Sequence, residues 1–431
     1  MRCVGGMREK IAVNQDVVII GGGISGMETA AALRRLGHRV FLVEKSDQLG
    51  GVFAELASLV ETREKPAEIV EKLKKQLLTD SDVAVFLQSQ VVDCFGVAGN
   101  FRVLISGPQG QQAINAGAVV IAIGLQTVLC PAKYGGLGMN DRVLGLLGLE
   151  KAIKQTEVKG QTYVFILGKT TENFYMPYIS TLKNALLLRE TYHKDVHVFT
   201  KNMKVAQEGL EELFGRARAA GVNFYRYEKD VQIIKQGDKI EVAYQDPFLQ
   251  TTGNSFKVAA DWLIIPEEIV PNEDARVLGQ IFRIRLDAYD FRGEDNVHIG
   301  PQFTSREGIY VVGNTHAPST YQAILMDAAL VAGEIQQKLP AAEVEVIANY
   351  PRVEAAKCVV CLTCYRCCPH GAIEIKHDYA SYNNLYGSVA YMNPIACRRC
   401  GICAAECPGK AITMPGYEDQ EILGQLKEAV N

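Results

Sequence analysis

The chain has 431 residues, of which 48% are hydrophobic and 22% are charged, and its formal net charge is −4. This length allows two or three domains with separate cores, and the composition is ordinary for a soluble globular protein. The small net charge argues against nucleic acid or an anionic membrane as a partner. The longest apolar candidate, 116–131, is too short for a membrane helix. We therefore expect no nucleic-acid partner and no direct membrane insertion.

The first seven residues contain no apolar region of the kind found in signal peptides. The chain also has twelve cysteines, and most of them are clustered at metal-ligand spacing rather than distributed as a disulfide framework. Thiols used in this way are typical of a reducing compartment. We therefore expect a cytoplasmic protein.

The first predicted unit along the chain is a dinucleotide-binding fold. An apolar strand, 16–20, leads into the turn Gly21-Gly22-Gly23-Ile24-Ser25-Gly26, and a helix is expected over 27–36. The next strand, 39–43, ends at Glu44. Strand, glycine turn, helix, strand and acid in this order form the Rossmann fingerprint.

Each position of this fingerprint has an expected role. Gly21 permits the tight turn, Gly23 lets the backbone approach a pyrophosphate, and Gly26 lets the helix pack on the strand. The helix N-terminus then faces the phosphates, and Glu44 accepts hydrogen bonds from ribose hydroxyls. The expected site also includes neighbours of these residues: Ile24, Ser25 and Lys45.

Three later segments resemble the FAD-binding parts of the two-dinucleotide-domain flavoproteins, the thioredoxin-reductase-like group. The first is the pair Gly50-Gly51; the second is 118–124, which includes Ala122 and Gly124; the third is 308–314, which ends in Gly313-Asn314. The resemblance implies an FAD site in an α/β fold. Asn314 stands where the family usually has an acid, so a hydrogen bond to the ribityl chain is expected without the charge. A helix over 323–339 corresponds to the one whose N-terminus faces the flavin ring.

A second α/β unit is expected between these FAD segments, where flavoprotein reductases hold their NAD(P)H domain. The turn after its first strand, 168–173, has one glycine instead of three, so nicotinamide binding is expected to be lost or altered. Retained NAD(P)H binding is the alternative. The expected elements are strands over 161–167, 195–199 and 222–225 and helices over 177–192 and 203–220.

The last part of the chain contains two copies of one cysteine pattern, C-x2-C-x2-C-x3-C-P, 39 residues apart. Bacterial-type ferredoxins hold two [4Fe–4S] clusters in this way, and the fourth cysteine of each run ligates the other cluster. The alternative of two zinc sites fits less well, because zinc sites use ligands in two pairs. One expected ligand set is Cys358, Cys361, Cys364 and Cys407, and the other is Cys397, Cys400, Cys403 and Cys368.

By these motifs the chain resembles the A-type subunit of heterodisulfide reductases and its relatives. The likeness runs from about Val17 to Thr413 and includes 181–187, 209–221, 308–317 and 358–375. It implies an FAD and iron–sulfur protein for electron transfer within a complex, and electron bifurcation is among the activities of such relatives. The implied partners are the B-type and C-type subunits of heterodisulfide-reductase-like complexes, or subunits linked to hydrogenase, formate dehydrogenase or adenylylsulfate reductase.

The chain departs from the resembled family in three ways. The glycine motif begins at Gly21, without the preceding domain of full-length members, and the chain stops soon after the ferredoxin module, so we expect a trimmed form. Where many members carry cysteines, this chain has 175–180 without one, so the extra cluster is expected to be absent.

The resemblance also places the helix that carries Lys183 near the flavin. A cation there would stabilise an anionic reduced ring, so Lys183 is the expected catalytic residue. The alternative is an exposed surface lysine, since helix lysines are usually exposed.

The expected architecture is a two-dinucleotide-domain α/β flavoprotein with a C-terminal α+β ferredoxin domain. We expect an oxidoreductase that converts two-electron flavin chemistry into one-electron transfer. One alternative is a self-sufficient NAD(P)H:ferredoxin-type or glutamate-synthase-small-subunit-like reductase, and another is a scaffold that its cofactors only stabilise. The expected boundaries are 1–155 and 271–340 for the FAD domain, 156–270 for the degenerate nucleotide domain, 345–417 for the ferredoxin domain and 418–431 for the tail.

Overall fold

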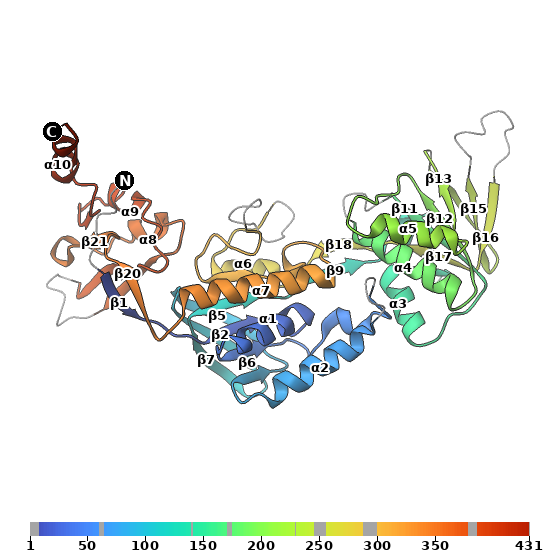
Figure 1. Ribbon diagram of the computed structural model, residues 1–431, viewed down its shortest axis with the longest axis horizontal. Helices are drawn as coiled ribbons and strands as arrows, with labels where there is room; N and C mark the ends of the chain where they lie inside the picture. The colour runs from blue at the N-terminus through green and yellow to red at the C-terminus, as the bar shows by residue number, and fades with distance from the viewer. Residues whose placement is uncertain are drawn as a thin grey trace.

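The computed structural model describes residues 8–59, 64–138, 141–169, 175–228, 230–244, 256–287, 300–377 and 386–430. Residues 1–7 lie outside this part, as do positions 170–173 of the predicted turn. The molecule is elongated, with a central domain between a second α/β domain at one end and the cysteine-rich module at the other (Figure 1). No helix in the described ranges combines the length and the apolar character needed to span a bilayer.

The central domain is built on a five-stranded parallel sheet. Its spatial order is β19 (Ile309–Val311), β8 (Ala118–Ile121), β2 (Val17–Ile20), β3 (Val40–Val43) and β4 (Val83–Phe86). Parallel strands buried on both faces are apolar throughout rather than alternating, which explains the uninterrupted runs in the sequence.

Two layers cover the faces of this sheet. Because alternate residues of a strand point to opposite faces, Val17 and Ile19 pack against helices while Val18 and Ile20 pack against the other layer. The helical layer consists of α1 (Ile24–Arg35), α2 (Pro66–Thr79) and α7 (Tyr321–Lys338). The other layer consists of the antiparallel strands β5 (Gln90–Val97), β6 (Asn100–Gly107) and β7 (Gly110–Ala116), together with α6 (Ala275–Phe282).

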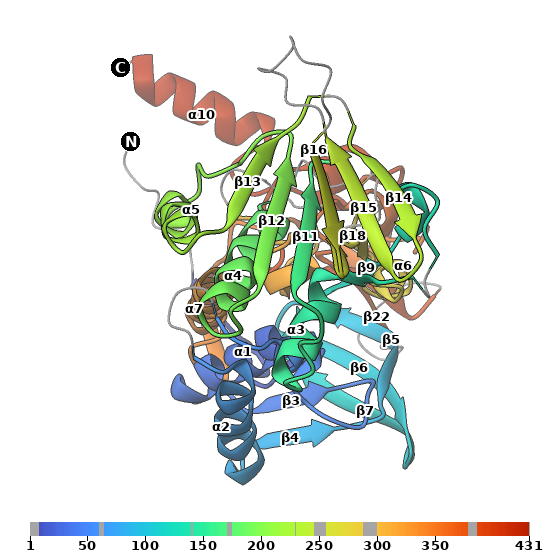
Figure 2. The same cartoon turned by 90° about the vertical axis from the view of Figure 1, so that its right-hand side faces the viewer.

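The second domain repeats this plan (Figure 2). Its parallel sheet has the order β10 (Val143–Gly145), β17 (Trp262–Ile265), β11 (Thr162–Leu167), β12 (Asp195–Thr200) and β13 (Asn223–Arg226). Its helices are α3 (Leu146–Lys154), α4 (Met176–Glu190) and α5 (Leu210–Ala219). Its antiparallel layer is β14 (Gln232–Gln236), β15 (Lys239–Tyr244) and β16 (Phe256–Ala260).

Two strands connect these domains, and they correct the first predicted boundary. β9 (Leu125–Val128) and β18 (Glu268–Pro271) pair antiparallel where the chain passes out and back. Residues 143–154 then join the second domain, because β10 pairs with β17 and α3 contributes to that domain's core. The first boundary therefore lies at β9, and the prediction of residue 155 was wrong.

The helix predicted over 203–220 is shorter than expected. α5 begins only at Leu210, because Gly209 before it adopts a left-handed conformation with φ of +74°. A residue in this conformation interrupts a right-handed helix, and glycine adopts it without steric cost.

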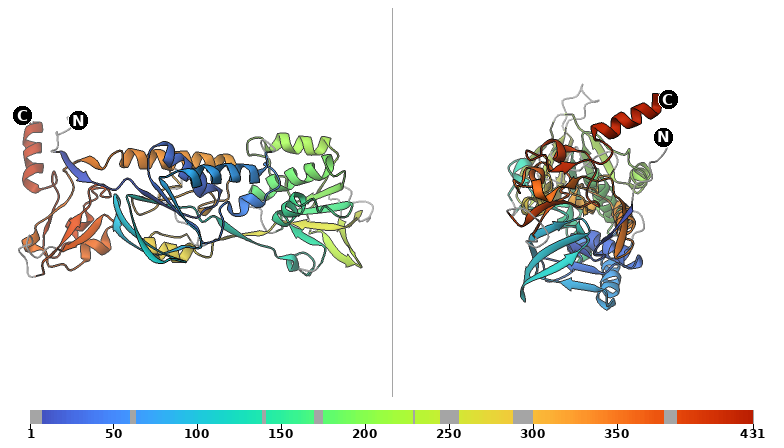
Figure 3. Two further views of the ribbon diagram at one scale, coloured as in Figure 1. Left: turned by 90° about the horizontal axis from the view of Figure 1, so that it is seen from below. Right: turned by 90° about the vertical axis from the view of Figure 1, so that its left-hand side faces the viewer.

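The cysteine-rich module is joined to the central domain by β1 (Arg8–Ala12), which pairs with β20 (Glu343–Ile347). Inside the module, β23 (Ser388–Met392) pairs antiparallel with β22 (Ile373–His377). Helix α10 (Asp419–Val430) projects from this end of the molecule (Figure 3). The module's elements are β21 (Arg352–Val353), α8 (Thr363–Cys367), β22 (Ile373–His377), β23 (Ser388–Met392), α9 (Ile402–Ala405), β24 (Ile412–Thr413) and α10 (Asp419–Val430).

Candidate cofactor sites

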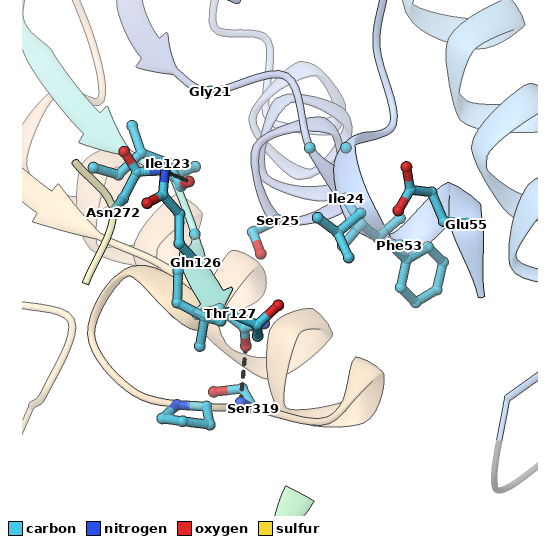
Figure 4. A pocket seen from close by; sticks show the side chains of 18 of the residues that line it. Gly21, Ile24, Ser25, Phe53, Glu55, Ile123, Gln126, Thr127, Asn272 and Ser319 are labelled. Atoms are coloured by element: carbon cyan, nitrogen blue, oxygen red, sulfur yellow. Dashed lines mark hydrogen bonds between the residues drawn. The ribbon is translucent and has the colours of Figure 1, made fainter. Parts of the chain in front are cut away.

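A cavity of about 930 Å³ lies where the central domain meets the second domain. It opens at the carboxyl ends of β2 and β3, beside the N-termini of α1 and α7, and α3 and α4 of the second domain complete its wall. Figure 4 shows Gly21, Ile24 and Ser25 on one side of it and Gln126, Thr127 and Ser319 across from them. Its volume is at the upper end of the range of about 300–1,000 Å³ for small-molecule sites, so a ligand as large as FAD fits it.

The three fingerprint glycines have different surroundings. Gly21 has φ of +109°, and a Cβ there would lie 2.3 Å from the carbonyl oxygen of Ala122. A Cβ on Gly26 would lie 1.9 Å from the carbonyl oxygen of Gly21. Gly23 lines the cavity, and a Cβ there would meet no atom within 4 Å. Gly21 and Gly26 are therefore required by the fold, whereas Gly23 leaves room for a ligand.

Glu44 holds the glycine turn and lines the cavity. Its Oε2 accepts a hydrogen bond from the amide of Gly22 at 2.5 Å, and its Oε1 accepts from the amide and the hydroxyl of Ser46 at 2.7 Å. The neighbouring Lys45 points to two carboxylates, Glu273 and Asp274, at 3.0 and 3.1 Å. Hydrogen bonds to these carboxylates raise the pKa of Lys45.

The second glycine pair lies directly against the first turn. The amide of Gly50 donates to the carbonyl oxygen of Gly22 at 2.9 Å, and Gly50 and Gly51 both have positive φ, +118° and +55°. A Cβ on Gly51 would lie 3.3 Å from the Cα of Gly23. The two turns thus form one backbone-lined wall, to which a phosphate group can come close.

The remaining predicted flavin residues come from two adjacent strand ends. Ala122 and Gly124 follow β8 and line the cavity. Asn314 lies in the turn after β19, and its Oδ1 accepts a hydrogen bond from the amide of Ser319 at 2.8 Å, marked in Figure 4. The Gly124 amide donates to the Thr315 hydroxyl at 3.0 Å, which fixes the two strand ends together.

Asp327, on α7, supports this turn, and sequence reasoning missed it. Its carboxylate accepts hydrogen bonds from the Gly313 amide at 2.8 Å, from Gln302 at 2.6 Å and from the His316 ring at 2.9 Å. Burial alone would raise the pKa of Asp327, but these hydrogen bonds outweigh burial and hold the pKa below its usual range. The sequence did offer one signal for this role: Asp327 is a charged residue on the apolar face of α7, three positions after Ile324.

Lys183 lies in the wall of the cavity, and only 10% of its side chain is exposed. Its ammonium group is 2.5 Å from a carboxylate oxygen of Glu150 and donates to the carbonyl oxygen of Ser58 at 2.8 Å. The other Glu150 oxygen accepts from the amide of Ala57 at 2.9 Å. The alternative of an exposed surface lysine was therefore wrong. Glu150 was missed, and the pairing neutralises much of the positive charge that Lys183 would present to a ligand.

A second buried carboxylate, Glu267, also lines the cavity and was not predicted. It accepts hydrogen bonds from the amides of Leu146 and Leu147 at 3.0 and 2.9 Å, and so caps the N-terminus of α3. Burial raises the pKa of Glu267, although these amides act in the opposite direction.

The eight patterned cysteines form two groups in the module. Burial raises the pKa of Cys364 and of Cys403 to about 12, and neighbouring thiols act in the same direction in each group. The thiols near Cys364 are Cys358, Cys361, Cys407 and the off-pattern Cys367, and those near Cys403 are Cys397, Cys368 and Cys400. A small cavity is lined by the first predicted ligand set, Cys358, Cys361, Cys364 and Cys407.

Thiols are the donors that iron–sulfur clusters use, and the first ligand set surrounds a shared space. Among the described residues, no three His, Cys, Asp or Glu side chains converge closely enough to hold one metal ion. The remaining described cysteines lie outside the two ligand patterns. Burial raises the pKa of one of them, Cys94, to about 11.

Comparisons with known proteins agree with this geometry. Residues 15–168 match the family model described as pyridine nucleotide-disulphide oxidoreductase. The chain is 22% identical to an A-type iron–sulfur subunit of the CoB–CoM heterodisulfide reductase of Methanopyrus kandleri, over 85% of this chain and 71% of that protein. It is 20% identical to the A-type subunit of the H(2):CoB-CoM heterodisulfide,ferredoxin reductase of Methanothermobacter marburgensis, over 87% and 71%.

Among solved structures, thioredoxin reductase of T. acidophilum is similar to this chain in fold. The TM-score is 0.51 at 17% identity, and the match covers 76% of this chain and 99% of that chain. These findings confirm the predicted resemblance to the A-type subunit of heterodisulfide reductases and the two-dinucleotide-domain fold. The chain is an oxidoreductase.

Proposed function

We propose that this oxidoreductase is an FAD- and [4Fe–4S]-containing electron-transfer component of a heterodisulfide-reductase-like complex. The observation that carries the proposal is that one chain joins a flavin-sized cavity to two groups of four thiols. FAD supplies two-electron chemistry when bound, whereas each cluster carries one electron, so the pair converts between the two.

The residues proposed to hold FAD are those that line the cavity from the central domain. The amides at the N-terminus of α1 would receive the pyrophosphate beside Gly23, and Glu44 would receive the ribose hydroxyls. Asn314 would bind the ribityl chain, with Asp327 holding its turn in place. The proposed set is Gly21, Gly23, Ile24, Ser25, Gly26, Glu44, Lys45, Gly50, Gly51, Ala122, Gly124, Gly313 and Asn314.

The two thiol groups are proposed to hold one [4Fe–4S] cluster each. Cys358, Cys361, Cys364 and Cys407 would form one ligand set, and Cys368, Cys397, Cys400 and Cys403 the other. Burial raises the pKa of Cys364 and of Cys403, so bound iron would have to compensate the negative charge of these two thiolates.

The second domain supports a role without nicotinamide. The N-terminal end of α4, which includes Met176, Pro177 and Ser180, lines the flavin cavity itself. In a nicotinamide-dependent reductase the second domain has to admit the nicotinamide ring to the flavin, and here its side chains contribute the wall of the cavity. Electron donors and acceptors are therefore proposed to be other redox proteins, including the partner subunits of a cytoplasmic complex, and bifurcation is one activity that such a complex would support.

Anaerobic purification with its associated proteins tests this proposal. We expect about eight iron atoms and about eight labile sulfides per chain, with one FAD, together with co-purifying redox subunits. We also expect NAD(P)H alone to leave the flavin absorbance unchanged. Bleaching by NAD(P)H would instead support the self-sufficient reductase, and an absence of flavin would overturn the proposal.

A further inference from the structure

A buried arginine of the central domain lies where that domain meets the cysteine-rich module. Arg306, in the loop before β19, is only 7% exposed. Its guanidinium donates to the carbonyl oxygens of Phe282 at 3.0 Å and Gly96 at 2.6 Å, and lies 5.3 Å from the centre of the Phe101 ring. Gly371 of the module lies against the same side chain, since a Cβ on Gly371 would be 3.1 Å from the Cγ of Arg306 and 3.4 Å from its Nε.

The positive charge of Arg306 has no ion-pair partner among the residues that the structure describes. The acid that acts on it across the interface is Glu374 of β22, and burial raises the pKa of that carboxyl, which disfavours its charged form. Burial also lowers the pKa of Arg306, but a guanidinium remains charged in proteins. Two carbonyl dipoles compensate a full charge only in part, and buried charges are usually paired. The surroundings of Arg306 therefore fit an anion beside it.

The turn that contains Gly371 holds one of the predicted cluster ligands. The amide of Gly371 donates to the carbonyl oxygen of Cys368 at 3.5 Å, and the next amide, of Ala372, donates to the Cys368 thiol at 3.4 Å. Cys368 and Cys397 also pack against a small alanine cluster that includes Ala98 of the central domain. Arg306 thus contacts the turn that carries a thiol of one predicted ligand set. We call this set the inner set: Cys368, Cys397, Cys400 and Cys403.

The internal repeat offers a comparison at the other ligand set. With the offset of 39 residues, Lys410 stands where the first repeat has Gly371, and Cys407 corresponds to Cys368. The amide of Ala411 donates to the Cys407 thiol at 3.3 Å, so both repeats make the same hydrogen bond to a thiol. Lys410 is exposed, and water and salt screen its charge. The two repeats therefore combine equivalent ligands with different charge environments.

We propose that Arg306 is the buried counter-charge of the cluster on the inner set and raises the reduction potential of that cluster, but not of the other. Four thiolates give such a cluster a net negative charge, which one-electron reduction increases. A fixed cation stabilises the reduced form more than the oxidised form, and more strongly where burial excludes water. This inference rests on the proposed function, because it needs both clusters. Its effect is to favour electrons on the cluster next to the central domain.

Redox titrations of the anaerobic holoprotein, monitored by EPR, test the proposal. Arg306→Gln removes the charge, and Arg306→Lys keeps a positive charge without the guanidinium shape. Lys410→Met is the control, because it removes a charge at the equivalent, exposed position of the other repeat. Cys403→Ala and Cys364→Ala, each lacking one expected cluster, assign the two signals to their ligand sets. Iron content is measured in every preparation.

We expect Arg306→Gln to shift the midpoint potential of the inner cluster to a more negative value and to leave the other cluster unchanged. Arg306→Lys should restore most of the wild-type potential, and Lys410→Met should change neither midpoint. An unchanged inner midpoint in Arg306→Gln, an equal shift of both clusters, or an equal shift in Arg306→Lys would overturn the proposal.

Iron content decides the case in which Arg306→Gln fails to hold the inner cluster. Inner-cluster iron retained by Arg306→Lys would then support the counter-charge. Loss of this iron from both variants would overturn the proposal, because packing of the arginine side chain would explain it without charge. Missing iron in the wild type would instead refute the proposed function.

Discussion

Replacing Gly23 by valine separates flavin binding from folding at a single position. Gly23 has φ of −71° and ψ of −179°, which any residue adopts, and its Cβ position is open to the cavity. The Cβ of the new side chain would therefore meet no atom of the protein within 4 Å. It would occupy the space where a pyrophosphate has to approach the backbone.

The magnitudes follow from these surroundings. The free energy of unfolding of the flavin-free protein is expected to change by less than about 1 kcal/mol, since a side chain at a compatible backbone position restricts the unfolded chain. The flavin content is expected to fall from about one per chain to nearly none. By contrast, Gly26→Val places a Cβ 1.9 Å from the carbonyl oxygen of Gly21, and overpacking of this kind costs about 1–3 kcal/mol or more.

The assay compares flavin absorbance with iron content and thermal unfolding in Gly23→Val, Gly26→Val and the control Gly333→Val. Gly333 lies on the exposed side of α7, with no atom within 4 Å of its Cβ position. Gly23→Val should lose flavin and keep its iron, and Gly333→Val should keep both. Full flavin retention in a folded Gly23→Val protein would refute the reasoning that this glycine faces the ligand.

Three further predictions concern buried groups. Lys183→Ala leaves the Glu150 carboxylate, which is 2% exposed, without its ion-pair partner. We expect the free energy of unfolding in chemical denaturation to fall by about 3–5 kcal/mol and the flavin potential to shift, and both effects should be relieved by adding Glu150→Gln. Unchanged stability and potential would contradict the ion pair. Cys364→Ala should halve the iron content from about eight to about four atoms per chain without loss of flavin. The control Cys367→Ala, at a nearby cysteine outside the pattern, should leave the iron content unaltered. Equal iron content in both variants would refute the ligand assignment. Asp327→Asn should cost about 1.5–3 kcal/mol at pH 7, because Asp327 accepts hydrogen bonds as an anion. Since the pKa of Asp327 is depressed in the folded protein, its contribution to stability is present above the ordinary pKa of 3.8 and is lost as the pH falls below that value. The difference in stability between the wild type and the variant should therefore disappear in acid. A difference that persists in acid would exclude the charged carboxylate as its source.

The sequence was most informative where one local motif determines a structure. The glycine turn at Gly21 and the apolar strands are local patterns, and their elements lie within a few residues of the predicted bounds. The boundary near residue 155 was missed because the sequences of β10 and α3 do not reveal which of the two domains these elements join. Only the pairing of β10 with β17 assigns them to the second domain. Long-range pairing of this kind leaves no local signal.

The candidate site shows the same limit. Gly23 and Glu44 line the cavity as their motif suggests, but the partner of Lys183 comes from α3, a separate helix earlier in the chain. Glu150, Glu267 and Asp327 each interrupt or adjoin an apolar stretch, which is the only trace of their burial in the sequence. Their hydrogen-bond partners depend on tertiary contacts, so their roles could not be assigned from spacing alone.

The paired strands β9 and β18 also bear on how such a chain arises and how it can be reshaped. Val128 and Glu268 lie opposite each other in this ladder, so the point where the second domain leaves its host is also the point where it returns. A domain whose two ends lie side by side can be inserted without opening the core of the host. Residues 129–267 therefore constitute an exchangeable unit: a short hairpin turn in their place would join β9 directly to β18, and a different domain grafted at the same two positions would inherit a place beside the cavity.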